Sequence, residues 1–281
     1  MADRDDYDSI KRMNASTLVH GLKSMWSLKC AIDGGFTSTP AMQFGSQYHC
    51  LILEPGEFTR THAVMPNFAI HADNIDAKGL PSTSANTSWA RETRTLFADE
   101  CEVNGREIIT EQNYEKAQAM IAGIQRNKLA TELIETSEKE VTLLGEIDGV
   151  EFKGRVDLLR TDALSDIKGT PNASDRPFGG SMAKLNTAFK MSIYRELIRQ
   201  QKNNAPDHVY LIAVESGGDF DTCVYEIPDI VLDNGFSKVR RTLEQFKIAR
   251  DTDTWPGLQA DEAVQLHVPN WSMDQDELEW L

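Results

Sequence analysis

The segment from Glu140 to Lys168, EVTLLGEIDGVEFKGRVDLLRTDALSDIK, constrains the fold more than any other part of the chain. Apolar residues alternate with polar ones along it, and Asp148-Gly149 is a pair typical of a tight two-residue β-hairpin. A second tight turn fits at Thr161-Asp162. The alternating apolar residues are Val141, Leu143, Phe152, Val156, Leu158 and Ile167. The pattern therefore predicts three consecutive antiparallel strands.

Two-residue loops would also define the register of both hairpins. Glu140 would lie opposite Asp157, and Asp157 opposite Asp166, so that three carboxylates form one row across the sheet. Neighbouring Cβ atoms in such a row are about 5 Å apart. Lys168 would share the face of Asp166, because side chains two apart on a strand point the same way. The opposite face of the sheet would be the apolar one.

A row of carboxylates suggests a bound cation, because like charges placed directly across a sheet repel each other. Hard oxygen ligands without a nearby cysteine fit Mg²⁺ or Mn²⁺. Since Mg²⁺ usually binds only one or two protein carboxylates and completes its shell with phosphate and water oxygens, the expected substrate is a phosphate ester. The alternative is a solvated sheet face of mixed charges, and a one-residue slip in either turn would remove the row.

Downstream patterns extend the predicted sheet. Strands are expected at His208 to Glu215 and at Thr222 to Ile227, and a helix precedes them, so the last strand of the meander and its new partner run parallel. The helix carries an apolar stripe of Leu185, Phe189, Ile193 and Leu197, and residues 169–180 form a loop before it. The predicted fold class is α/β, with a mixed central sheet, an antiparallel meander plus a parallel crossover strand, flanked by helices.

The remaining boundaries follow from capping residues and composition. Asn14 or Ser16 is expected to cap a helix that runs to Leu28, Ser46 a second helix, and Thr110 a third that ends near Gln125. Residues 66–92 are expected to be irregular. The expected organisation is an acidic flexible leader at 1–13, a single domain at 14–271 and an acidic tail at 272–281. Within the domain we expect a helical part at about 14–130, the sheet at about 138–230 and a final helix at about 233–251.

Asp157, followed nine residues later by Asp166-Ile167-Lys168, resembles the signature of the PD-(D/E)xK nuclease superfamily. The wider context is similar to its RecE-like (exonuclease VIII-type) branch, which occurs in phages and prophages and is related to the RecB and lambda exonuclease nucleases. Three further matches support it: residues 44–49 with His49 ahead of Leu-Glu-Pro at 53–55, the motif at 153–157, and Glu140 as the upstream acid. One position departs, because Lys190 stands four residues before Tyr194 where the family usually has Gln.

The resemblance implies roles for individual residues. Asp157 and Asp166 would hold one or two Mg²⁺ or Mn²⁺ ions, with Glu140 and the Ile167 carbonyl as further ligands and His49 near the second position. Lys168 would orient the attacking water or offset charge in the transition state. The residues expected to contact DNA are Lys153, Arg155, Lys190 and Tyr194.

Composition limits where such an enzyme can bind DNA. The 281 residues carry a formal charge of −15, so overall attraction to nucleic acid is absent and basic residues must be concentrated in one groove. Cys30, Cys50, Cys101 and Cys223 show no zinc-site spacing, which indicates free thiols in a reducing cytoplasm. The resemblance to phage and prophage nucleases implies that this is the cytoplasm of a bacterial host. No apolar run is long enough to span a membrane.

The leading functional hypothesis is an exonuclease that digests duplex DNA ends. The resemblance implies digestion from 5′ to 3′ by a ring-shaped homo-oligomer, which leaves a 3′ single-stranded tail for a single-strand annealing protein. Two alternatives remain open from the residues alone: an endonuclease or nickase of the same superfamily, and a DNA-binding or assembly module with a decayed site.

Overall fold

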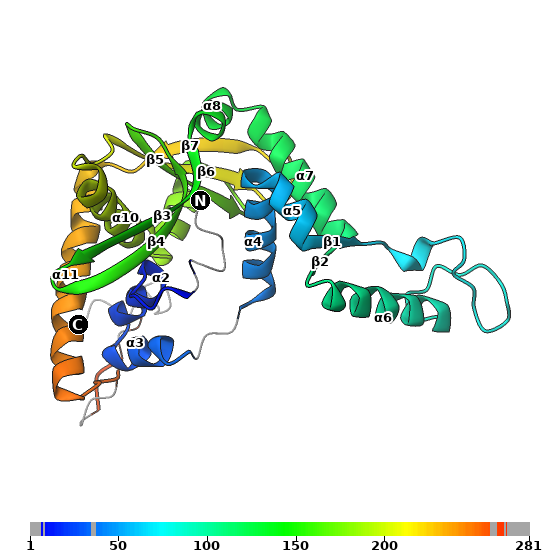
Figure 1. The fold of residues 1–281 in the computed structure, drawn as a ribbon, viewed down its shortest axis with the longest axis horizontal. Helices are drawn as coiled ribbons and strands as arrows, with labels where there is room; N and C mark the ends of the chain where they lie inside the picture. The colour runs from blue at the N-terminus through cyan, green and yellow to red at the C-terminus, as the bar shows by residue number, and fades with distance from the viewer. Residues whose placement is uncertain (1–6, 8, 35–37, 259–262, 267, 269–281) are drawn as a thin grey trace, which may run out of the picture.

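A computed structural model describes residues 7, 9–34, 38–258, 263–266 and 268, and its centre is a five-stranded mixed sheet (Figure 1). In spatial order the sheet consists of β3 (Glu138–Ile147), β4 (Val150–Leu159), β5 (Ala163–Thr170), β6 (His208–Glu215) and β7 (Thr222–Glu226). Strands β3, β4 and β5 form the antiparallel meander, and β6 pairs with β5 in parallel. The predicted fold class is confirmed.

Both predicted hairpin turns are present. Asp148 and Gly149 both have positive φ angles, of 49° and 81°, which is the backbone of the turn that such a pair favours. Val141 lies opposite Val156 in the first hairpin, which is the predicted register. In the second hairpin Leu158 lies opposite Ser165, again as predicted, but the pairing extends over only two residue pairs and does not reach Asp157.

The α-helices range in length from 4 residues in α2 to 24 residues in α11. They are α2 (Ala15–Leu18), α3 (Met25–Ile32), α4 (Pro40–Leu53), α5 (Pro55–Thr61), α6 (Ser88–Val103), α7 (Glu111–Gln125), α8 (Lys128–Thr136), α9 (Asp175–Lys184), α10 (Thr187–Lys202) and α11 (Asp229–Thr252), with 3₁₀ turns η1 (Val19–Leu22) and η2 (Phe68–Ile70). Helices α9 and α10 form the crossover from β5 to β6. The predicted helix that follows Thr110 is α7, and Thr110 caps it as expected.

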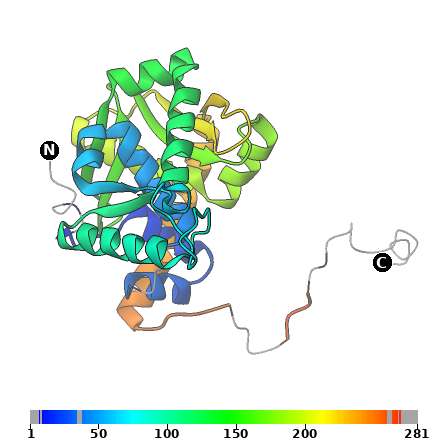
Figure 2. The ribbon, with the colours of Figure 1, turned by 90° about the vertical axis from the view of Figure 1, so that its right-hand side faces the viewer.

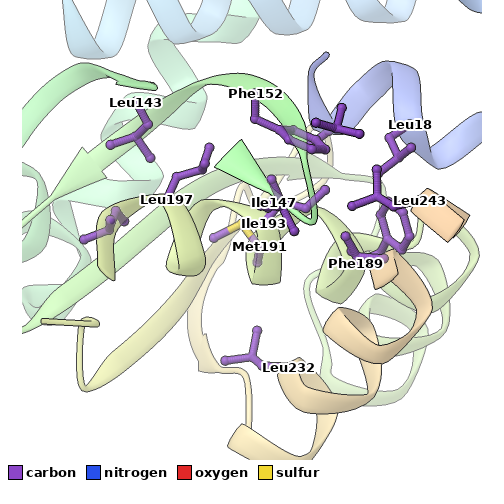
Figure 3. Packing of buried hydrophobic residues seen from close by; sticks show 14 of the residues in the cluster. Leu18, Leu143, Ile147, Phe152, Phe189, Met191, Ile193, Leu197, Leu232 and Leu243 are labelled. Carbon is purple, nitrogen blue, oxygen red and sulfur yellow. The ribbon is translucent and has the colours of Figure 1, made fainter. Parts of the chain in front are cut away.

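Helices cover both faces of the sheet, so the expectation of a single apolar face was wrong. Val156 packs in a cluster with residues of α2, α3, α10 and α11, part of which Figure 3 shows. Leu158 packs in a second cluster with residues of α4, α7 and α8. Val156 and Leu158 are two residues apart and would share a face on a regular strand, but here they belong to different clusters, so the alternation is interrupted between them. Glu140, which faces this part of β4, has a left-handed backbone with φ of 51°.

One predicted helix start and the extent of another predicted helix were wrong, because other residues cap the helices. Asn14 accepts a hydrogen bond from the Thr17 N–H, as predicted, but the helix breaks after η1 and Ser24 caps a new one. The next helix begins at Pro40 with Thr39 as its cap, so Ser46 lies inside α4. Proline is favoured at a first helical position because its missing N–H would have no partner there.

Three boundaries near the crossover also differ from the prediction. Strand β5 continues to Thr170 and α9 begins at Asp175, so residues 169–180 are not one loop. Leu185 lies between the two helices with 55% of its surface exposed, and it does not belong to the buried stripe of Phe189, Ile193 and Leu197. The last helix begins at Asp229, four residues earlier than expected.

Residues 62–110 form an arm that projects from the sheet domain (Figures 1 and 2). Strands β1 (His62–Met65) and β2 (Glu107–Thr110) pair in parallel at its base, and α6 runs along it. Residues 66–87 are irregular apart from η2, as predicted, but the prediction was wrong for residues 88–92, which form the first turn of α6 after its cap Thr87. The irregular residues are held by Asn74, which is fully buried and whose amide lies 2.8–3.0 Å from the carbonyl oxygens of Ala69, Ser82 and Ser84. The irregular segment is therefore organised around one side chain.

The end of the predicted leader is not free. Met13 forms a parallel bridge with Phe152, and its N–H donates to the Glu151 carbonyl over 3.1 Å. Residues 1–6 and 8 of the leader and the acidic tail at 272–281 lie outside the described residues. All four cysteines are free. Within the described part of the chain, every helix is too short or too polar to cross a bilayer.

Alanine at two helical glycines should have opposite effects on stability, because only Gly235 lies at the close contact between α10 and α11. A Cβ atom at Gly235 would lie 2.6 Å from the Ala188 carbonyl oxygen, so Gly235→Ala should lower the free energy of unfolding by about 1–3 kcal/mol through overpacking. Gly179 lies in α9 with open space around its Cα, so Gly179→Ala should raise it by about 0.5–1 kcal/mol. Urea unfolding of both variants tests this, and equal effects would contradict the close approach of the two helices.

Candidate active site

Strands β4 and β5 separate at Asp157, and a side chain replaces the lost backbone pairing. Beyond Leu158 the two strands share no further residue pairs. The Oδ2 atom of Asp157 accepts a hydrogen bond from the Ile167 N–H over 2.8 Å. The carboxylate therefore occupies the opening between the strands, at the position that the sequence predicted for the first metal ligand.

Three potential metal ligands converge at this opening from three elements. They are His49 on α4, Glu140 on β3 and Asp157 on β4, and one donor atom of each lies within 4.8 Å of the others. The His49 Nδ1 atom is 3.4 Å from the Asp157 Oδ2 atom. Two ligands of one Mg²⁺ lie at most about 4.2 Å apart, so a small side-chain adjustment would bring all three into one shell. The donor set fits a hard divalent cation.

Asp166 and Lys168 form an ion pair on β5. The Lys168 Nζ atom lies 2.5 Å from the Asp166 Oδ2 atom, and both side chains are mostly buried. Asp166 does not belong to the group formed by His49, Glu140 and Asp157. The structure thus brings three of the predicted ligands together and places the third carboxylate, Asp166, next to the predicted catalytic lysine.

The pKa values of the three acids shift in different directions, because burial and neighbouring carboxylates raise them while neighbouring cations and a hydrogen bond lower them. Burial, followed by the charge of Asp157, raises the pKa of Glu140 to about 7. Burial also raises the pKa of Asp166, although Lys168 opposes the shift. Burial would raise the pKa of Asp157 as well, but His49, Lys168 and the Ile167 N–H outweigh it, and the net shift is downward. Asp157 is therefore the carboxylate most readily ionised in this cluster.

The basic groups respond to the same carboxylates. Burial alone would lower the pKa of His49, but the charge of Asp157 outweighs it and the pKa is raised. Burial alone would also lower the pKa of Lys168, but the charges of Asp166 and Asp157 outweigh burial, and the pKa is raised. The pKa of Lys190 is lowered, first by burial and then by repulsion from Lys168. Two ammonium groups thus act on one another beside the carboxylates.

The cluster opens into a cavity of about 980 Å³. His49, Glu140 and Asp157 line it together with Ile167 and Lys168. Its other basic lining residues, among those described, are Lys116, Arg155 and Lys190. A ligand in the cavity would meet carboxylates at one place and cations around them, which suits a phosphate ester bound through a metal.

The four residues expected to contact DNA differ in their access to the cavity. Arg155 and Lys190 line it, while Lys153 and Tyr194 are absent from its walls. Lys153 is 7% exposed and donates to the Tyr7 carbonyl over 2.9 Å, because the N-terminal segment covers it. Lys153 and Tyr194 therefore do not face the cavity in which a DNA strand was expected to bind.

Tyr194 has a packing role that explains a glycine in the motif at 153–157. A Cβ atom at Gly154 would lie 3.0 Å from the Tyr194 ring. Burial, and then the charge of Asp166, raises the pKa of the Tyr194 hydroxyl. The ring can therefore pack against β4 beside the cluster only because residue 154 has no side chain.

Sequence reasoning missed the contact of Arg155 with a predicted metal ligand, and it missed Tyr7 altogether. Arg155 pairs with Glu140, with its Nε atom 3.5 Å from Oε2, and so faces a predicted metal ligand. Tyr7 lines the cavity, and its ring lies 5.3 Å from the Arg155 guanidinium and 4.4 Å from the Lys153 ammonium. The predicted hairpin register, which sets Thr142 opposite Arg155, puts Arg155 close to Glu140. The sequence around Tyr7 carries no signal of its contacts.

Comparisons with known proteins agree with this architecture. The family described as "PDDEXK-like domain of unknown function (DUF3799)" matches residues 14–264. The crystal structure of a protein from Eubacterium rectale, described as "putative exonuclease", superposes with a TM-score of 0.62 at 12% identity, covering 97% of each chain. The structure of SSO0001 reaches a TM-score of only 0.29 at 13% identity over 76% of this chain and 89% of that chain, and supports no argument. No curated protein matches.

The raised pKa of Glu140 predicts a pH-dependent gain in stability for Glu140→Gln without metal. A carboxyl whose pKa rises from 4.5 in the unfolded chain to about 7 in the folded one is increasingly costly to bury as pH rises between these values. The variant's advantage in free energy of unfolding should thus grow between pH 5 and 7 and level off near pH 8, at about 2–3 kcal/mol. Urea unfolding in EDTA measures it. Glu146→Gln, on the same strand but exposed, is the control, and an equal gain there would contradict the assignment.

Proposed function

Because the chain belongs to the family of PDDEXK-like domains of unknown function, we propose that it is a nuclease that hydrolyses DNA phosphodiester bonds with a divalent metal. The observation that carries the proposal is the convergence of His49, Glu140 and Asp157 beside Lys168, in a cavity otherwise rich in cations. The two carboxylates at this spacing suit Mg²⁺ or Mn²⁺, the His49 nitrogen suits Mn²⁺ better than Mg²⁺, and a phosphodiester would complete the shell.

Each residue of the cluster has a role in this proposal. When bound, a divalent metal lowers the pKa of a coordinated water and stabilises charge on the phosphate oxygens. Asp157, Glu140 and His49 would hold it, and Asp166 and the Ile167 carbonyl would be further ligands. Asp157 is the anchor because it is ionised most readily and its orientation is held by the Ile167 N–H.

Three cations act on the substrate rather than on the metal. Lys168 lines the cavity with an ammonium held by Asp166, where it can donate to a phosphate oxygen or orient the attacking water. Arg155 and Lys190 line the same cavity and attract the flanking phosphates. Lys190, at the position where RecE-like nucleases usually have Gln, contributes a charge here, whereas an amide would contribute only hydrogen bonds.

We propose further that the enzyme digests linear duplex DNA from its ends, from 5′ to 3′, and leaves a 3′ tail for a single-strand annealing protein. The resemblance to RecE-like exonucleases motivates this assignment, and so does the charge of −15. An acidic monomer holds DNA weakly by bulk electrostatics, so enclosure by a homo-oligomer would keep it on the strand.

The first prediction concerns the carboxylates. Asp157→Ala and Asp166→Ala should each reduce cleavage by at least about 10²-fold, because each removes a charge from the site. Neither removes a packed apolar group, but Asp157→Ala also leaves the buried Ile167 N–H without its acceptor and should lower the free energy of unfolding by about 1–3 kcal/mol. Time courses of duplex digestion with Mg²⁺ or EDTA measure the cleavage. Glu151→Ala, an exposed acid on β4, is the control and should cleave normally. Full activity of purified Asp166→Ala protein would refute the assignment.

The second prediction concerns DNA ends. Linear duplexes should be shortened while closed circles are spared, with activity falling steeply as salt rises, and light scattering should detect a homo-oligomer. End-labelled strands report the polarity of digestion. A monomer that nicks closed circles as fast as it shortens linear DNA would indicate an endonuclease. Binding of DNA without cleavage under any divalent metal would indicate a decayed site.

A further inference from the structure

A second cavity, of about 780 Å³, adjoins the active-site cavity. It lies between the N-terminal segment that contains α2 and η1 and the junction of α9 with α10. Met42, Leu185 and Lys190 line both cavities, so the two meet at these residues. We call the second cavity the lysine cavity, after Lys23, Lys184 and Lys190 in its walls.

The charge of the lysine cavity is opposite to that of the chain. The sequence has 44 acidic residues and 29 Lys or Arg, yet no Asp or Glu is among the described residues that line this cavity. The apolar cavity between α9 and α11 includes Asp175 and Glu226, and the one on α11 includes Asp148 and Glu244. In this acidic protein, the described residues that line the lysine cavity therefore include cations but no carboxylates, although the cavity adjoins the one that contains the carboxylate cluster.

The N-terminus of α10 and the apolar residues of the lysine cavity would also contribute to binding an anionic ligand. Helix α10 begins at the lysine cavity, and Asn186 at its N-cap position makes no side-chain capping hydrogen bond. The N–H groups and the positive end of a 16-residue helix thus supplement the lysines in attracting an anion. Val19, Leu22 and Leu185 provide apolar wall for a sugar or a base.

We propose that the lysine cavity binds the phosphodiester backbone of one DNA strand next to the scissile phosphate, which makes Lys23 and Lys184 strand-binding residues. This inference rests on the proposed nuclease function. A strand fits better than a single small anion because the lysines come from three elements, the end of η1, α9 and α10, and Lys190 links them to the active-site cavity. Successive phosphates can follow this path from Lys168 past Lys190.

The first test measures binding in the Asp166→Ala background with fluorescently labelled DNA. Replacing both Lys23 and Lys184 by Ala should raise Kd about 10-fold and reduce the slope of log K against log salt by about 1.4–1.8, because two phosphate contacts are lost. The control replaces Lys78 and Lys202, two exposed lysines outside both cavities, and should change Kd less than about 2-fold. Thermal unfolding verifies that both double variants are folded.

The second test separates the strand path from the chemistry. The active Lys23→Ala/Lys184→Ala variant should hydrolyse thymidine 5′-(4-nitrophenyl phosphate), which needs only the active-site cavity, as fast as the unsubstituted protein. At low DNA concentration it should shorten a linear duplex about 10-fold more slowly. If the unsubstituted protein cleaves neither substrate, the nuclease proposal fails.

Two other outcomes overturn only the strand path. If the unsubstituted protein digests DNA and the Lys23→Ala/Lys184→Ala variant matches the control pair, the lysine cavity does not bind the strand. If inorganic phosphate competes fully with DNA and longer strands bind no better than a dinucleotide, the cavity is a small-anion site.

Discussion

The active-site cluster depends on the separation of two hydrogen-bonded strands at one residue. Asp157 accepts the Ile167 N–H that a neighbouring strand would otherwise bond, and the opening this leaves admits His49 from α4 and Glu140 from β3. Closing the β4–β5 ladder would satisfy the backbone but remove the space for a metal and a phosphate. The fold therefore substitutes a side-chain acceptor for a backbone one, and the buried amide stays paired.

Charge is distributed in a way that the net value of −15 conceals. Buried carboxylates whose pKa values are shifted in different directions lie at the centre, and Lys168, Arg155 and Lys190 surround them. The lysine cavity extends this cationic lining outward. The rest of the acidic surface would repel a polyanion, which would restrict favourable contact with one to this region. An acidic exterior can in this way favour the correct approach of a polyanion over non-specific adsorption.

The sheet could be predicted from the sequence because its signals are local. Asp148-Gly149 and the alternating apolar residues define the first hairpin and its register. The motifs that resemble those of RecE-like nucleases predict a site of His49, Glu140, Asp157, Asp166 and Lys168, and the first three of these lie together in the structure. Contacts between distant segments have no such signal. Thr39 rather than Ser46 caps α4, Lys153 is covered by Tyr7, and Tyr194 packs on Gly154. The extension of DNA-binding roles to Lys153 and Tyr194 followed motif position, which does not reveal burial.

The hydrogen bond between Ile167 and Asp157 makes one backbone amide a spectroscopic reporter of the site. Its acceptor is a carboxylate oxygen, whose electron density changes when a proton or a cation binds, whereas neighbouring amides of β5 donate to carbonyl oxygens of β6. The ¹H and ¹⁵N shifts of Ile167 should thus respond to occupancy of the cluster far more than those of the residues beside it. A single isotope-labelled isoleucine would report ligand binding at this site without any measurement of turnover.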